Sequence, residues 1–324
     1  TTGSTSAINY IIKSNGSTLS PPAVTVPGYI LLDNTCPGCA TAATAATATV
    51  NGNAITLGGA LSAGALAGTT GLTINAVANG TGNGLNQAAY AISSSAGGVT
   101  INVNSQVGGY AYYSTGTITA TGQTIAINTT TTTGIGINDT GAITGGVVTI
   151  AASQTTATAT ATPVTVTGLI TANTVTITGS GGASSTIVSL GAVTINAGGG
   201  NLTVTANDVA AGGNTGITQT GAITDNAVGS NLIFTSNNLI NQAGAISLVA
   251  NTGAPAANVI YDTTSGNKAS NITGGAVTFT TGANSVMNYL AKSSGSAINP
   301  GAIGTSTASL PGYVTLDNTY GCSG

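Results

Sequence analysis

The residue types that most often carry enzyme chemistry are scarce in this chain of 324 residues. It has three lysines, six aspartates and no histidine, arginine or glutamate. Enzymes that cleave acidic polysaccharides need clustered Asp, Arg, Lys or His to bind uronates and move protons. Here the aspartates are scattered, and stacking of the chain would be needed to bring even Asp208 and Asp225 together. We interpret them as solvated corner residues that bond nearby amides, and we expect no catalysis, no metal site and no cofactor.

Three cysteines are the other reactive side chains. The CPGC stretch from Cys36 to Cys39 resembles a redox CxxC motif, but no helical pattern follows it. A Pro-Gly turn can still bring the two sulfurs close enough for a local disulfide. Cys322 is left over near the other end, and an odd cysteine in a secreted chain suggests a partner outside it. Cys36, Cys39 and Cys322 are therefore candidates for a disulfide or for a junction between copies.

The densest aromatic stretch is YAYY, from Tyr110 to Tyr113. Strand alternation predicts that Tyr110 and Tyr112 share one face and that Tyr113 lies on the other. The three rings form a candidate interaction patch for sugars or for a neighbouring subunit. Cross-strand packing within the chain is the alternative.

Composition excludes several classes of protein. Charged residues make up 3% of the chain, against roughly 25% in an ordinary soluble domain, and the mean hydropathy of +0.36 is too high for intrinsic disorder. No apolar run approaches the ~18–20 residues of a membrane helix, and nothing basic is present to bind nucleic acid. A surface with so little charge favours self-association. The cysteines suit an extracellular setting, and the absence of an initiating Met or a signal peptide predicts a mature product or a fragment.

Internal repeats dominate the second half of the chain. The phrase GAVTINAGGGNLTVTAND, starting at Gly191, returns as GAITDNAVGSNLIFTSNN, starting at Gly221. The phrase GITQTGAIT, starting at Gly216, returns as LINQAGAIS, starting at Leu239, and GINDTGAIT precedes both at Gly136. The repeating unit is therefore about 20–30 residues long, which is typical of solenoids.

Within each repeat, apolar and polar residues alternate, as in Leu202 and Val204 against Thr203 and Thr205. This period predicts short strands with one buried face, and stacked units of this length predict an all-β fold, a right-handed parallel β-helix or β-solenoid. We expect one continuous domain over 1–324. TIN triplets, such as the one ending at Asn102, predict ladders of asparagine amides.

Two Thr/Ala tracts leave the choice between strand and loop open. They are Thr41–Val50 and Thr155–Val166, and in the second Pro163 favours an edge or a corner. Threonines at alternate positions, as in Thr174, Thr176 and Thr178, also allow an ice-binding face as an alternative function. Outward threonine is, however, the ordinary choice for a strand that avoids charge.

The segment NLIFTSNNLINQAGAISLVANTG, from Asn231 to Gly253, resembles the haemagglutination-activity repeats of filamentous-haemagglutinin-like exoproteins. The resemblance covers roughly 134–324. It implies a right-handed β-helical shaft on the bacterial cell surface or outside the cell, secreted by the two-partner route and serving adhesion, biofilm or fibre formation. The export motif of that family, of the NPNG or NPNL type, is absent from this sequence.

The two ends of the chain repeat each other. TTGSTSAINYIIKSNGS at 1–17 matches TTGANSVMNYLAKSSGS at 280–296, and PGYILLDNTCPGC at 27–39 matches PGYVTLDNTYGC at 311–322. We therefore expect segments 1–39 and 280–322 to be homologous ends that join copies head to tail in a homopolymer. A shaft segment of a large monomeric adhesin, with glycans or surfaces as partners, is the alternative. Neither reading involves nucleic acid or membrane insertion.

Overall fold

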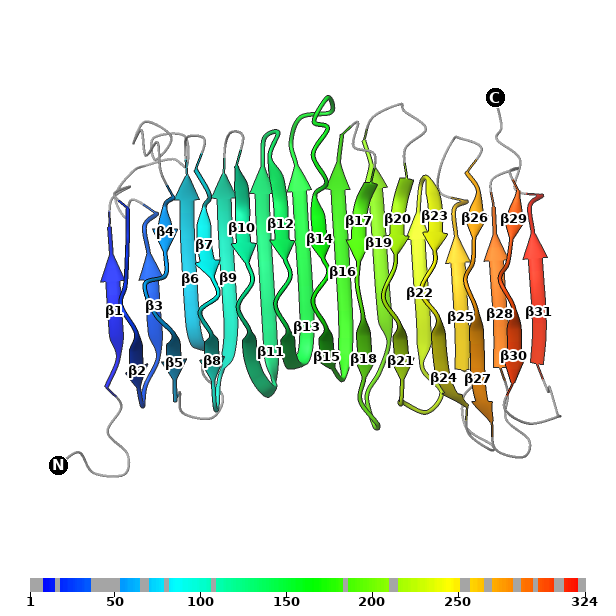
Figure 1. Cartoon of the computed structure of the whole chain (residues 1–324), viewed down its shortest axis with the longest axis horizontal. Helices are drawn as coiled ribbons and strands as arrows, with labels where there is room; N and C mark the ends of the chain where they lie inside the picture. The colour runs from blue at the N-terminus through cyan, green and yellow to red at the C-terminus, as the bar shows by residue number, and fades with distance from the viewer. Residues whose placement is uncertain are drawn as a thin grey trace. The chain divides into compact units, whose positions relative to one another are not determined.

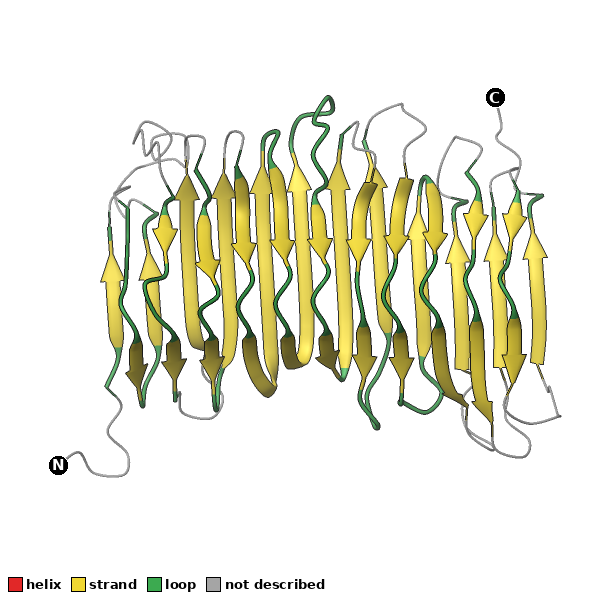
Figure 2. Cartoon of the chain, in the orientation of Figure 1, coloured by secondary structure: helices red, strands yellow, loops and turns green. Residues whose placement is uncertain are grey.

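The computed structural model describes most of the chain. The described residues are 8–14, 18–35, 53–64, 70–78, 82–105, 109–182, 186–209, 215–250, 257–264, 270–281, 287–293, 297–305 and 312–319. Every regular element in these ranges is a β-strand (Figure 2), and the strands pair in parallel, coil on coil. The prediction of an all-β solenoid is confirmed. No helix long and apolar enough to span a membrane occurs in the described part.

The chain divides into two units, Thr1–Thr156 and Ala157–Gly324. In unit 1 the strands follow one another in three parallel rows, which we call the long, short and middle rows (Figure 1). The long row contains β1 (Tyr10–Lys13), β3 (Ile30–Asp33), β6 (Thr70–Ala78), β9 (Gly98–Ser105) and the second parts of β11 (Ile118–Thr131) and β13 (Ile143–Gln154). The short row contains β2 (Val24–Val26), β5 (Leu61–Ala63), β8 (Ile92–Ser94) and the first parts of β11 and β13; the middle row contains β4 (Ile55–Thr56), β7 (Leu85–Ala88), β10 (Tyr110–Ser114) and β12 (Ile135–Asp139).

Unit 2 has the same three rows. Its long row contains β16 (Thr174–Gly181), β19 (Leu202–Asp208), β22 (Asn231–Ser236), β25 (Ala257–Asp262), β28 (Met287–Lys292) and β31 (Gly312–Asp317). Its short row contains β15 (Ile170–Ala172), β18 (Val193–Ile195), β21 (Ile223–Asp225), β24 (Ile246–Ala250), β27 (Val277–Thr281) and β30 (Ile303–Thr305); its middle row contains β14 (Val164–Val166), β17 (Thr186–Leu190), β20 (Thr215–Gln219), β23 (Leu239–Gln242), β26 (Ile272–Thr273) and β29 (Ile298–Asn299).

Strand register confirms the repeats read from the sequence. Leu202 of β19 is the Cα partner of Leu232 in β22, and Val193 of β18 is the partner of Ile223 in β21. Each sequence repeat is therefore one coil placed directly on the previous one. Inward positions stack into continuous apolar columns, such as Val175, Leu202, Leu232 and Val259 in unit 2, all fully buried. Burying each such side chain contributes about 1.5–3 kcal/mol.

Asparagine ladders run along the outside of the long row. In unit 1 the Nδ2 of Asn102 donates to the Oδ1 of Asn75 at 3.0 Å, and the Nδ2 of Asn128 donates to the Oδ1 of Asn102 at 3.0 Å. The ladder predicted from the TIN triplets is confirmed there. A second ladder in unit 2 was not predicted; its members are Asn201, Asn231, Asn258 and Asn288.

The second Thr/Ala tract is mostly loop. Residues 155–163 form no strand, and β14 begins only at Val164, directly after Pro163. The strand alternative for this part is therefore wrong: the backbone nitrogens of Thr155 and Thr156 still bond the previous coil, at 2.8 and 3.2 Å, but Pro163 has no N–H to donate to a ladder. The first tract, Thr41–Val50, lies outside the described residues.

Three aromatic rings stack inside unit 2 on successive coils. The ring centroids of Phe234 and Tyr261 lie 5.3 Å apart, and those of Tyr261 and Tyr289 lie 5.5 Å apart. The hydroxyl of Tyr261 donates to the Oε1 of Gln242 at 2.9 Å. The hydroxyl of Tyr289 is buried and has no hydrogen-bond partner among the described residues.

This difference predicts opposite effects for the same substitution. Tyr261→Phe should destabilise the chain by about 1 kcal/mol, because it removes a buried hydrogen bond, whereas Tyr289→Phe should be neutral or stabilise it by up to about 1 kcal/mol, because it removes a buried group with no partner. Chemical denaturation of both variants beside the wild type measures the two changes. An equal loss of stability in both variants would contradict the assignment of the hydroxyl partners.

Candidate functional site

The two homologous ends fold into the same pair of strands. In unit 1, β1 pairs with β3 so that Tyr10 is the partner of Ile30 and Lys13 the partner of Asp33. In unit 2, β28 pairs with β31 so that Tyr289 is the partner of Val314 and Lys292 the partner of Asp317. These are equivalent positions in the two copies of the sequence. The terminal repeat is therefore a repeat of structure as well, down to strand register.

The same turn closes both copies. The Oδ1 of Asp33 accepts hydrogen bonds from the backbone nitrogen and the hydroxyl of Thr35, at 2.9 and 2.5 Å. The Oδ1 of Asp317 accepts the equivalent two bonds from Thr319, at 2.9 and 2.6 Å. These bonds lower the pKa of the exposed Asp317 carboxyl below its usual value. Because the aspartate accepts from the backbone nitrogen two residues later, it stabilises a turn there, and the strand ends at the same residue in both copies.

The two copies differ in what covers them. Ile30 and Leu32 of β3 are fully buried, because β6 pairs with the far side of β3. The equivalent residues of β31, Val314 and Leu316, are 58% and 48% exposed. Among the described strands of unit 2, β31 pairs with β28 alone. The inward face of β31 is thus an apolar surface of the kind that a further coil covers at β3.

An asparagine shows the same difference. Asn34, which follows β3, is fully buried; its Oδ1 accepts from the backbone nitrogen of Val77 at 2.8 Å, and its Nδ2 donates to the Val77 carbonyl at 3.5 Å. Val77 belongs to the next coil. The equivalent Asn318 is exposed, and its amide has no hydrogen bond within the described part of unit 2. Asn318 therefore offers a contact that Asn34 makes to a neighbouring coil.

Strand β1 forms the opposite edge. It pairs only with β3 among the described strands of unit 1. Tyr10 and Ile12 alternate with the exposed residues Ile11 and Lys13, and both are only half-buried. The equivalent residues of β28, Tyr289 and Ala291, are buried. Both edge strands thus present inward-facing apolar side chains that an additional coil would cover.

The structure does not describe the predicted cysteine site. Cys36, Cys39 and Cys322 all lie outside the described residues. A local disulfide and a disulfide at a junction both stay predictions.

The tyrosine patch differs from its prediction. Tyr110 and Tyr113 lie together on the outside of β10, with ring centroids 5.3 Å apart. Tyr112 is fully buried, and its hydroxyl donates to the Oε1 of Gln87 at 2.5 Å. Burial, and then the nearby Asp139 carboxyl, raise the pKa of Tyr112 well above its usual value. The expected pairing of Tyr110 with Tyr112 is wrong because β10 buries two consecutive residues, Ala111 and Tyr112, so the alternation skips one position.

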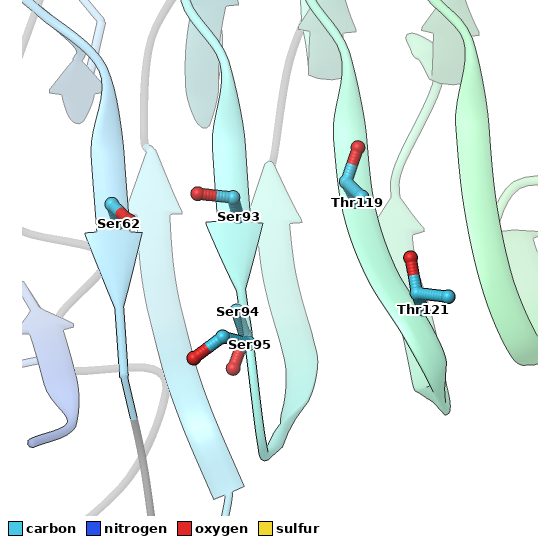
Figure 3. A pocket seen from close by; sticks show the side chains of 6 residues that line it. All are labelled: Ser62, Ser93, Ser94, Ser95, Thr119 and Thr121. Atoms are coloured by element: carbon cyan, nitrogen blue, oxygen red, sulfur yellow. The ribbon is translucent and has the colours of Figure 1, made fainter.

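Hydroxyl side chains line a shallow recess of about 370 Å³ on unit 1 (Figure 3). It is formed by the short row, where Ser62 of β5, Ser93 of β8 and Thr119 of β11 are successive Cα partners. The remaining lining residues are Ser94, Ser95 and Thr121. None of the six titrates near neutral pH, so the recess can donate and accept neutral hydrogen bonds and has no group for acid–base chemistry.

Asp225 bonds within its own turn and Asp208 bonds the next coil, and both are buried, so the prediction that they are solvated is wrong. Asp225 accepts from the backbone nitrogen of Ala227 at 2.9 Å and from the Ser230 hydroxyl, and Asp208 accepts from the Nδ2 of Asn238 at 2.5 Å. Register gives Asp225 the partners Ile195 and Leu248, so stacking does not pair it with Asp208. No cluster of three or more metal-ligating side chains occurs among the described residues.

One aspartate stands apart from the sequence interpretation. Asp139, at the end of β12, is fully buried; its Oδ1 accepts from the backbone nitrogen of Gly141 at 2.9 Å, while its Oδ2 has no partner in the described structure. Burial raises the pKa of Asp139 to about 7, against the opposing hydrogen bonds of Gly141 and Ser114. The sequence could have indicated this burial, because Asp139 aligns with Gln219 when GINDTGAIT is compared with GITQTGAIT, and Gln219 occupies an inward position.

The threonine columns needed by the ice-binding alternative are short. Thr176 and Thr178 of β16 are followed on the next coil by Thr203 and Thr205. One coil later an isoleucine, Ile233, replaces the first of each pair. The described part of unit 2 therefore has no continuous two-column array of threonines.

We compared the chain with protein-family models, with curated proteins and with solved structures, and none of them matches it.

Proposed function

We propose that this protein is a structural subunit of a bacterial extracellular or cell-surface filament, in which copies assemble head to tail through their homologous ends. One observation carries the proposal. The same two positions of the terminal repeat are fully buried as Ile30 and Leu32 and about half exposed as Val314 and Leu316. Uncovered solenoid edges with apolar inward faces tend to add further strands.

The composition supports this setting. A chain with 3% charged residues has little colloidal repulsion to oppose association. The β-solenoid fold agrees with the filamentous-haemagglutinin-like shaft that the sequence resembles, and adhesion and biofilm formation are the roles that the resemblance implies. The recess is lined by neutral hydroxyls, and no cluster of acidic or metal-ligating side chains occurs among the described residues, which supports a structural role.

The shaft of a large monomeric adhesin is the second candidate. The observation that favours it is the terminal repeat itself, since segments 1–39 and 280–322 are also what a tandem module would produce. In that case a covalently continuous coil, and not a second copy, covers Val314 and Leu316. Tyr110 and Tyr113, which are paired on the outside of β10, are then candidates for contacts with glycans.

Electron microscopy of the native material, with and without reductant, tests the proposed function. We expect filaments with an axial repeat near the length of one chain, and shortening under reductant would assign Cys322 to the junction. Dispersed single particles under both conditions would contradict assembly and favour the adhesin shaft.

A further inference from the structure

We propose that β31 of one copy pairs in parallel with β1 of a second copy, in the register that sets Asp317 beside Lys13. Val314 then lies opposite Tyr10, and Leu316 lies opposite Ile12. The inference rests on the proposed function and specifies its junction. In this proposal, the strand that covers the open edge of unit 2 is β1 of another copy of this chain.

Charge is the first argument for this register. Five of the nine charged residues, three lysines plus six aspartates, lie in one outward column of the long row, at the ends of β1, β3, β25, β28 and β31. In unit 2 the column reads Asp262, Lys292, Asp317, and in unit 1 it begins with Lys13 and Asp33. The signs alternate within each unit, and the two edges carry opposite signs. Placing Asp317 beside Lys13 continues the alternation without a break, and charge complementarity of this kind selects register and partner.

The charges are confined to the strands nearest the two edges. Farther inside, the same column is occupied by neutral residues, Asn75 in β6 and Thr235 in β22. The pairs Lys13–Asp33 and Lys292–Asp317 both belong to the terminal repeat, so the repeat itself places opposite charges at the two edges that the proposal joins.

The apolar columns give the second argument. Val314 and Leu316 end the two inward columns of unit 2, and Tyr10 and Ile12 begin the two inward columns of unit 1. The proposed register joins each column end to a column start. A shift by one residue would turn both apolar pairs toward solvent, because side chains alternate along a strand. A shift by two would place Asp317 beside Ile11 and leave Lys13 unmatched.

The polarity of the junction follows from the same strands. The edge of β31 and the edge of β1 are different surfaces, so a joined pair still has one free β1 edge and one free β31 edge. Such a heterologous contact does not close on itself and extends into a filament.

Cysteine cross-linking of the full chain tests this register. In a background with Cys36, Cys39 and Cys322 changed to serine, two single variants are made, Ile11→Cys and Thr315→Cys. The outward residues Ile11 and Thr315 face each other across the proposed junction, as Ile11 and Leu31 do within the chain. The double variant Ile11→Cys/Leu31→Cys is the matched control, which should form its disulfide within one chain.

We expect mild oxidation to give a disulfide-linked pair when the two single variants are mixed, and none from either variant alone. A linked pair from one variant alone would overturn the head-to-tail polarity. A stronger product from Thr315→Cys mixed with Lys13→Cys would overturn the register. Filaments without any cross-link would overturn the junction while leaving the proposed filament standing, whereas the absence of filaments from the serine background and the wild type would overturn both.

Discussion

Replacing Leu316 with serine should weaken head-to-tail association and leave the fold intact. Replacing the equivalent Leu32 with serine should instead destabilise the fold and leave the joining surface unchanged. Leu316 is 48% exposed and Leu32 is fully buried. Fully burying a leucine contributes about 1.5–3 kcal/mol, and about half of this is available at Leu316, so each junction should weaken roughly threefold to tenfold. Leu32→Ser leaves a cavity and a buried hydroxyl between β1 and β6, and it should cost about 3–5 kcal/mol of folding free energy.

Two measurements separate the effects. Filament length distribution, by electron microscopy or sedimentation, reports the junction, and thermal unfolding followed by circular dichroism reports the fold. Leu316→Ser should shorten filaments with an unfolding midpoint close to that of the wild type, since changes at exposed positions usually stay within about 0.5 kcal/mol. Filaments of unchanged length in Leu316→Ser would show that the inward face of β31 is not the joining surface.

Much of the fold follows from the repeats because strand geometry leaves few alternatives. Inward and outward residues alternate, so a coil whose apolar residues match those of the next coil can pair in one register only. Leu202 on Leu232 and Val193 on Ile223 were predicted on this ground, and both pairs are found. The pairing of Asn75 with Asn102 followed in the same way, because an amide at the same position in each coil has a partner one rung away. Asn128, which belongs to no TIN triplet, extends this ladder by one coil.

The placement of Tyr112 could not be obtained from alternation alone. Four middle-row strands, β10, β12, β17 and β20, bury two consecutive residues and so interrupt the alternation. The interruption depends on how the coil bends around the core, which is a property of the stacked structure and not of one strand. The sequence likewise contained the terminal repeat, but only the structure shows that one copy is covered by β6 and that the other is exposed.

Asp139→Asn should stabilise the protein above pH 7 and have little effect near pH 4. Burial raises the pKa of this carboxyl in the folded state from 3.8 to about 7. The folded state therefore binds the proton more tightly than the unfolded state does. The contribution of the group to stability is fully present below about pH 4 and is lost as the pH rises toward 7. A difference of about three pKa units corresponds to roughly 4 kcal/mol, and the asparagine, which has no charge to bury, avoids this loss.

The matched control is Asp262→Asn, which removes a carboxylate from the outward column of β25 and leaves the core unchanged. Unfolding midpoints of the wild type and both variants, measured at pH 4, 6 and 8, separate the effect of burial from that of net charge. Because the desolvation is local to Asp139, its variant alone should gain stability progressively from pH 4 to pH 8. Equal gains in the two variants would mean that general charge repulsion, and not the buried Asp139 carboxyl, makes the fold sensitive to pH.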